Sequence, residues 1–343
     1  MKMAGLFSPG KRIALLSTLL VVLFFASTMI GRTQIRLPEI VSLFSAMFGR
    51  TGPEESLASN QLVFWWIRLP RCIMAVIVGS GMSVSGAVYQ ALFRNPLVSP
   101  DILGVSAGCT FGAALGLILP GNSFLLTQVL AFVFGIGAVA MAMGVARLIA
   151  VKPVIVLVLS GMVVLSLFNA LLMVLKYFSD PYEELPTIVF WIMGSLTRVT
   201  WQDLFTALPV TGIGLALFMA LGFRLNILSL GDTQSKSLGM NPAFFRTLLI
   251  AVSSFIVATI VATCGQICWI GLIVPHMART IAGPNHETML PATALLGAIF
   301  MVAADMAARS ITTAEIPVGI ITALVGAPIF GFLLYKNRGS GWL

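Results

Sequence analysis

Long stretches without a charged residue constrain this sequence more than any other feature. Gaps of about one membrane span run from Arg12 to Arg32, Arg71 to Arg94, Lys152 to Lys176, Asp203 to Arg224 and Glu315 to Lys336. A helix needs about 20 mostly apolar residues to cross hydrocarbon, because its backbone polar groups find no water there. Each of these gaps therefore predicts one transmembrane helix.

Two longer gaps predict pairs of helices. The gap from Asp101 to Arg147 is about twice as long, and the turn signal Pro120-Gly121-Asn122 divides it. The gap from Arg246 to Arg279 predicts one full span and a shorter one, which separate near Cys264-Gly265-Gln266.

One further span lies between Glu287 and Arg309 and is interrupted only by Asp305. Together the gaps predict an all-α polytopic membrane protein of about ten transmembrane helices, with both termini on the same side of the membrane. The stretch from Ala4 to Ile30 is long enough for a span and lacks a small-residue cleavage site, so we interpret it as a membrane helix and not as a signal peptide.

The composition excludes several classes of protein. Only 9% of the residues are charged and 58% are hydrophobic, whereas a soluble domain is about 25% charged. Soluble enzymes and disordered chains are therefore excluded. The basic residues are scattered singly and form no stripe that could follow a phosphate backbone, so we expect no nucleic-acid partner.

The distribution of Lys and Arg favours a cytoplasmic N-terminus and C-terminus. With the N-terminus inside, most basic residues fall on the inner side, as expected for membrane proteins. The first external loop is the exception, since it would hold Arg32, Arg36, Arg50, Arg68 and Arg71.

No pattern for ATP hydrolysis or metal binding occurs in the sequence. It has two His, four Cys without metal-finger spacing and no Walker A motif. We therefore expect no enzyme activity and no cofactor or metal bound by this chain. An ion-coupled transporter would need an acid inside the membrane, for which Asp305 is the candidate, but an ion pair with Arg309 four residues later is the simpler interpretation.

Two polar segments can be interpreted in more than one way. Arg68-Leu69-Pro70-Arg71 stands at the predicted start of the second span, where the arginines either anchor the helix at the interface or dock an acidic partner. The stretch from Leu230 to Pro242 can form a short helix over Asp232 to Leu238 that stops at Gly239 and is available to a partner, or it can be a plain loop.

Five blocks of sequence resemble, in order and spacing, the FecCD family of permeases. They are RLPR, RNPLVSPDILGVSAG, GDTQSKSLGM, GLIVPHMAR and EIPVGIITALVGAP, and they extend over nearly the whole chain. Members of this family are membrane subunits of type II ABC importers for ferric siderophores, haem and cobalamin. The resemblance implies the type II ABC importer permease fold, as a single transmembrane permease domain over residues 1–343. A polar coupling-helix segment, 229–242, would lie between helices six and seven.

The resemblance also implies roles for individual residues. An extracytoplasmic substrate-binding protein would dock on Arg68, Arg71 and Arg309. The ATPase would be coupled through Gly231, Asp232, Lys236, Leu238, Gly239, Met240, Asn241 and Pro242. The translocation path and its gate would be lined by residues of the fifth and tenth helices, namely Val154, Ile155, Ser160, Asn169, Met173, Thr322 and Pro328.

The function implied is that of a permease subunit of an ATP-driven importer. It would move an iron chelate, with a ferric siderophore as the first choice, across the cytoplasmic (inner) membrane of a bacterial or archaeal cell. Haem, cobalamin and molybdate remain alternative cargoes of the same mechanism. ATP and Mg would bind two separate ATP-binding cassette subunits, and a second permease chain, another copy of this one or a paralogue, would complete the pathway.

Overall fold

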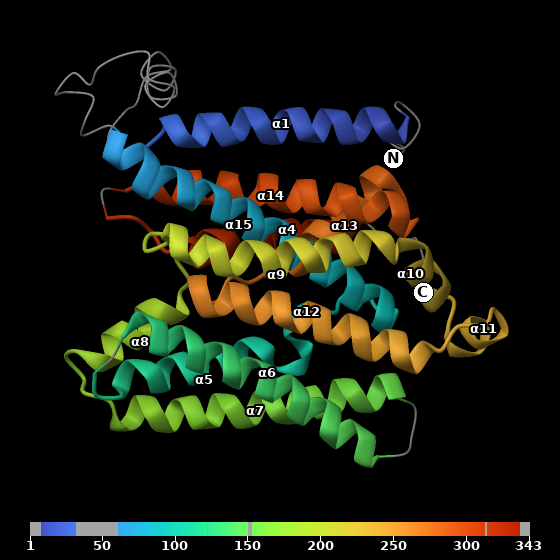
Figure 1. Cartoon of the computed structure of the whole chain (residues 1–343), viewed down its shortest axis with the longest axis horizontal. Helices are drawn as coiled ribbons and strands as arrows, with labels where there is room; N and C mark the ends of the chain where they lie inside the picture. Colours follow the sequence, from blue (N-terminus) through green and yellow to red (C-terminus); the bar gives the residue numbers. More distant parts are fainter. Residues whose placement is uncertain (1–7, 32–60, 122, 150–152, 313, 337–343) are drawn as a thin grey trace.

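A computed structural model describes residues 8–31, 61–121, 123–149, 153–312 and 314–336. Every regular element in these residues is a helix (Figure 1). The first half of the chain forms α1 (Pro9–Met29), η2 (Val63–Arg68), α4 (Leu69–Phe93), η3 (Pro100–Leu103), α5 (Val105–Ile118), α6 (Phe124–Leu148) and α7 (Pro153–Phe178). The second half forms α8 (Glu184–Ile192), α9 (Trp201–Ala220), α10 (Gly222–Ser229), α11 (Asp232–Ser237), α12 (Pro242–Cys264), α13 (Ile270–Ala282), α14 (His286–Ser310) and α15 (Val318–Lys336).

The number of membrane helices agrees with the charge-free gaps. In the described residues, seven helical stretches are long and apolar enough to cross a membrane: α1, η2 with α4, α6, α7, α9, α12 and α14. Three shorter apolar helices, α5, α13 and α15, complete the set of about ten. The short helices α8 and α10 were not predicted, since neither fills a charge-free gap.

The predicted divisions of the two long gaps are confirmed. Helix α5 ends at Ile118 and α6 begins at Phe124, with Gly121 between them at a φ of 77° in the left-handed region. Helix α12 ends at Cys264 and α13 begins at Ile270.

The structure corrects the predicted start of the second span. Helical structure begins before Arg68, because η2 is a π-helical segment that continues directly into α4. Its wider turns are compatible with Pro70, which has no backbone N–H to donate to the preceding turn. The backbone N–H of Leu69 bonds instead to the carbonyl of Phe64, five residues earlier.

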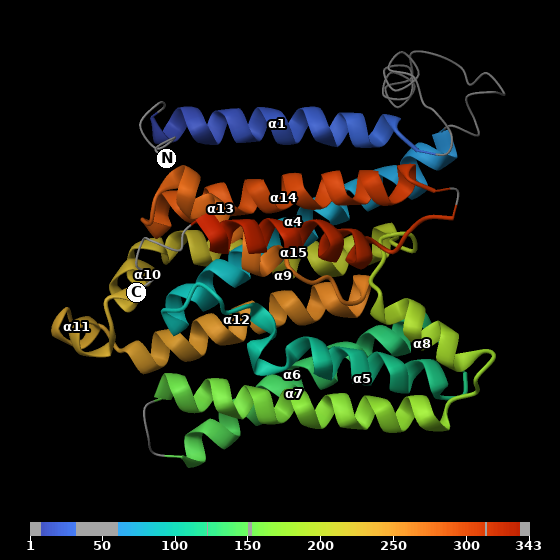
Figure 2. The ribbon, with the colours of Figure 1, turned by 180° about the vertical axis from the view of Figure 1, so that it is seen from behind.

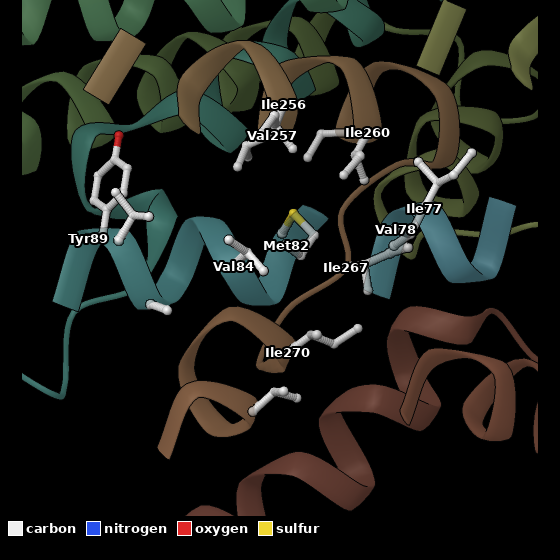
Figure 3. Packing of buried hydrophobic residues seen from close by; sticks show 14 of the residues in the cluster. Ile77, Val78, Met82, Val84, Tyr89, Ile256, Val257, Ile260, Ile267 and Ile270 are labelled. Atoms are coloured by element: carbon white, nitrogen blue, oxygen red, sulfur yellow. The ribbon is translucent and has the colours of Figure 1, made fainter. Parts of the chain in front are cut away.

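Helix α4 is the centre of the bundle and packs against α9, α12, α13 and α14. Figure 3 shows Met82 and Val84 of α4 between Ile256, Val257 and Ile260 of α12 on one side and Ile270 of α13 on the other. Small residues allow the closest approach, as their density in this segment predicts. At Gly79 a Cβ atom would overlap the backbone of Gly297 in α14, so neither helix can carry a larger residue at the crossing.

The bundle has two distinct ends. Helix α11 lies at one end, together with the start of α1 and the end of α15, while α8 and the turn between α5 and α6 lie at the other (Figures 1 and 2). We refer to these as the α11 end and the α8 end. Helix α1 thus begins, and helix α15 ends, at the same end of the bundle, as the predicted count of about ten helices implies.

Candidate functional site

The three arginines predicted for docking gather at the α8 end, and two of them bind the last turn of α1. Arg68 donates to the carbonyls of Thr28 (2.7 Å) and Met29 (3.0 Å). Arg309 donates to the carbonyls of Ser27 and Ile30, each at 3.1 Å, and to the Ser27 hydroxyl at 2.6 Å. The last carbonyls of a helix have no partner within it, so a cation there is favourable. These arginines therefore attach α1 to η2 and α14.

The third arginine joins a buried group of charges. Arg71 Nε lies 2.8 Å from Asp305 Oδ1, its Nη1 lies 2.6 Å from Glu315 Oε2, and Asp305 Oδ2 lies 3.1 Å from Arg309 Nε. Two cations thus meet two carboxylates, and their charges balance. We call Arg71, Asp305, Arg309 and Glu315 the charge network. It confirms the predicted pair of Asp305 with Arg309 and adds two partners distant in sequence.

Burial limits what these arginines can do in this conformation. Arg68 and Arg71 are each 4% exposed and Arg309 is 6% exposed, and all three make contacts within the chain. A partner's carboxylate would have to compete with these contacts. Docking on the arginines therefore stays a prediction. The same network also removes the basis for an ion-coupled transporter at Asp305, because that carboxylate is fully buried between two cations.

The polar coupling segment forms the short helix that was predicted. Helix α11 runs over Asp232–Ser237, Gly239 follows at a φ of 77°, and Met240 N–H bonds back to the Ser235 carbonyl at 2.9 Å. Lys236 and Leu238 are exposed at its tip. Leu238 is 60% exposed, so an apolar side chain stands at the surface of this polar segment.

Several contacts hold α11 in place. Asp232 forms an ion pair with Arg246 of α12 at 2.7 Å. The buried hydroxyl of Ser235 bonds to the Ile227 carbonyl of α10 at 3.0 Å. The Arg94 guanidinium, at the turn after α4, lies against Gly231, which has a φ of 114°. The sequence predicted no role for Arg94 or Arg246, each of which only bounds a charge-free gap.

The remaining coupling residues start α12. The side chain of Asn241 accepts a hydrogen bond from Phe244 N–H at 3.2 Å, and Pro242 occupies the first position of the helix. Both are common choices for a helix N-terminus. Helix α11 and the start of α12 are therefore joined by a short turn and by the ion pair of Asp232 with Arg246.

The predicted pathway residues divide by exposure. Ile155, Asn169, Met173 and Pro328 are exposed and Val154 is half-buried. Ser160 is 2% exposed and Thr322 is fully buried, so both face the interior of the chain. Lining of the pathway by these residues stays a prediction. Helix α7 packs against α5 and α6, whereas α15 packs against α13 and α14.

Asp101 is a polar residue that the sequence reasoning used only as the boundary of a gap. It lies in η3 and accepts a hydrogen bond from the Ser106 hydroxyl in the first turn of α5. A carboxylate at a helix N-terminus is stabilised by the helix dipole. Asp101 therefore stabilises the start of α5, which comes after the turn that follows Arg94.

Comparison with known proteins agrees with this architecture. Residues 19–336 match the FecCD transport family. The chain is 40% identical to the molybdate import system permease protein MolB of Haemophilus influenzae, over 95% of this chain and 96% of that protein. It is 39% identical to a Helicobacter pylori permease named for an iron chelatin transport system, over 83% of this chain and 86% of that one.

A solved structure shows the same fold. It is described as an ABC transporter of metal-chelate type in an inward-facing conformation, with a TM-score of 0.85 and 39% sequence identity. The match covers 95% of this chain and 99% of the other. The chain belongs to the FecCD family of ABC importer permeases.

Proposed function

We propose that this permease carries an iron chelate, with a ferric siderophore as the first choice, inward across the cytoplasmic membrane. The 39% identity to the iron chelatin permease of Helicobacter pylori supports this cargo. The 40% identity to the molybdate permease of Haemophilus influenzae favours molybdate as a second candidate. Haem and cobalamin are further alternatives for the same mechanism.

The observation that carries the proposed mechanism is the braced and exposed helix α11. A helix that projects from one end of the bundle and is attached to α10 and α12 can receive force from an ATPase subunit and pass it to the membrane helices. We place the α11 end in the cytoplasm. Arg94, Arg246 and Lys236 at this end support that orientation, because basic residues concentrate on the cytoplasmic side.

The pathway would form between two permease chains. Helices α7 and α15 carry exposed apolar residues, among them Met162, Met173 and Leu324, on parts of the bundle that do not pack against each other. A second chain facing these helices would enclose a path with weak contacts, and weak contacts allow a bulky chelate to leave again. We expect a second copy of this chain, with a paralogue as the alternative.

ATP hydrolysis by the purified assembly in lipid nanodiscs tests the proposal. The assembly contains this chain and its two ATPase subunits, and candidate binding proteins are added empty or loaded with ferric siderophore, molybdate, haem or cobalamin. We expect the protein loaded with ferric siderophore to stimulate hydrolysis above its empty form. Stimulation only by the molybdate-loaded binding protein would make molybdate the cargo in place of the ferric siderophore. If no loaded binding protein stimulated hydrolysis, the mechanism would be contradicted.

A further inference from the structure

A cavity of about 490 Å³ opens at the α8 end, and of the candidate site residues described above only Glu315 lines it. Its walls come from the end of α5, the start of α6, helix α8, the loop before α9, the end of α12 and the turn before α15. Thr187, Phe190 and Arg198 are exposed at its mouth, while Cys264 and Gly265 are buried at its floor. Cavities that hold organic ligands have volumes of about 300–1,000 Å³.

The floor of the cavity is fixed by the backbone. Ser195 N–H bonds to the Cys264 carbonyl at 2.8 Å, which joins the loop before α9 to the end of α12. Gly194 N–H bonds to the Trp191 carbonyl at 3.2 Å, which holds the same loop to the end of α8. The cavity is therefore a preformed feature of the fold.

The charges in the cavity leave one cation uncompensated. Its charged lining residues are Arg198 and Glu315. Glu315 is neutralised by Arg71, 2.6 Å away, within the charge network. In the described part of the chain, Arg198 has no ion pair or hydrogen bond from its guanidinium. A negative charge on a ligand would therefore favour its binding in this cavity.

The hydroxyl groups are arranged differently from those of a simple oxyanion site. Thr187 and Thr263 each donate to a carbonyl four residues earlier, so toward a ligand their oxygens can act only as acceptors. Ser195 and Thr197 bond to each other at 2.8 Å, and this pair retains one proton that can be donated to a ligand. An oxyanion offers only acceptors and would meet the two acceptor oxygens of these threonines. A ligand with O–H or N–H groups of its own can satisfy them.

The size and the apolar walls exclude a small ion as the best occupant. A tetrahedral oxyanion is about the size of a few water molecules, each of which takes up about 30 Å³, and would leave most of the cavity unfilled. The walls include Phe124, Phe190 and Trp191, whose rings suit an aromatic or apolar ligand.

We propose that this cavity is an outward-facing subsite for an anionic organic ligand that has an aromatic or apolar part and hydrogen-bond donors. Arg198 binds its negative charge, Thr187 and Thr263 accept its donors, and the aromatic side chains contact its apolar part. The proposal rests on the proposed function, in which a chelate of this chemistry is the cargo. Each permease chain would then hold the cargo at its outer face before the shared pathway opens.

Direct binding to the full-length chain in lipid nanodiscs, with no binding protein present, tests the subsite. The probe is the ferric complex of 2,3-dihydroxybenzoylserine, which combines aromatic rings, carboxylates and amide N–H groups. Its affinity is measured by calorimetry, and quenching of Trp191 fluorescence, assigned with Trp191→Phe, locates it. Lys176→Gln is the matched control, because Lys176 is a cation of the same end of the bundle that does not line the cavity.

We expect Arg198→Gln to weaken the affinity by about tenfold or more, since a charge-assisted hydrogen bond is lost. Arg198→Lys should keep most of the affinity, Lys176→Gln should keep all of it, and Thr187→Trp should block binding by filling the mouth. Molybdate should bind at least about tenfold more weakly than the probe, because the acceptor oxygens disfavour it. Gel filtration confirms that each variant is folded.

Three results would overturn the subsite. They are unchanged affinity in Arg198→Gln, molybdate binding as tight as the probe, and binding of the probe only when a binding protein is present, which would make this a protein-docking surface. If Arg198→Gln left ATP-driven uptake of the probe unchanged, this result would also overturn the subsite, while the proposed function would stand. Binding at the cavity without any uptake of the probe would instead support the subsite and contradict the proposed cargo.

Discussion

At the scale of single residues, the arginines at the α8 end hold the helices together. Arg68 and Arg309 bind the last carbonyls of α1, and Arg71 shares Asp305 with Arg309. Sequence spacing could predict only the local pair of Asp305 with Arg309. Arg71 and Glu315 are far apart in sequence, so no local pattern shows that they meet. The same holds for Arg198, whose significance depends on a cavity built from several helices.

Replacing Asp305 with Ala would leave Arg71 and Arg309 buried without this carboxylate. The loss of one partner of a buried ion pair destabilises a protein by about 3–5 kcal/mol. We expect a lower thermal unfolding midpoint for Asp305→Ala in detergent and a smaller drop for Asp305→Asn. Glu183→Gln, on an exposed residue of the α8 end, is the control. Equal midpoints for Asp305→Ala and the control would contradict a stabilising role of the charge network.

At the scale of helices, close packing and exposed tips have separate consequences. Gly79 touches the backbone of Gly297, so even one added methyl group must push α4 away from α14. Overpacking of this kind costs about 1–3 kcal/mol. We expect Gly79→Ala to lower the unfolding midpoint. Gly137→Ala in α6, where nothing lies within 4 Å, should leave it unchanged or raise it. A midpoint unaffected by Gly79→Ala would show that the crossing is looser than observed.

Helix α11 offers an exposed apolar tip for its partner. Leu238 is 60% exposed and makes no contribution to the core. A buried contact of this side chain with an ATPase subunit would be lost in Leu238→Asp, because a charge in an apolar interface is strongly unfavourable. We expect this variant to fold normally but to lose ATPase subunits in co-purification. Leu119→Asp makes the same change at the α8 end and should retain them. If Leu238→Asp retained the ATPase subunits, Leu238 would not be part of the contact with them.

At the scale of the whole molecule, the charge-free gaps predicted the number of helices and most of their divisions. Hydrocarbon requires apolar segments of one length, so this signal is local and can be read from the sequence. The short helices α8 and α10 could not be predicted in this way, nor could the π-helical start of the second span. Ser160 and Thr322 were predicted for the pathway yet are buried, because helix packing decides which face of α7 and α15 is exposed.

Uptake into proteoliposomes tests whether this permease imports a ferric chelate at the expense of ATP. The vesicles contain this permease with its ATPase subunits, and a binding protein loaded with a radiolabelled ferric chelate is added outside. We expect iron to accumulate only with ATP inside, where the α11 end faces the ATPase, and Leu238→Asp to reduce uptake to the level without ATP. Accumulation that follows an ion gradient and proceeds without ATP would contradict ATP-driven import.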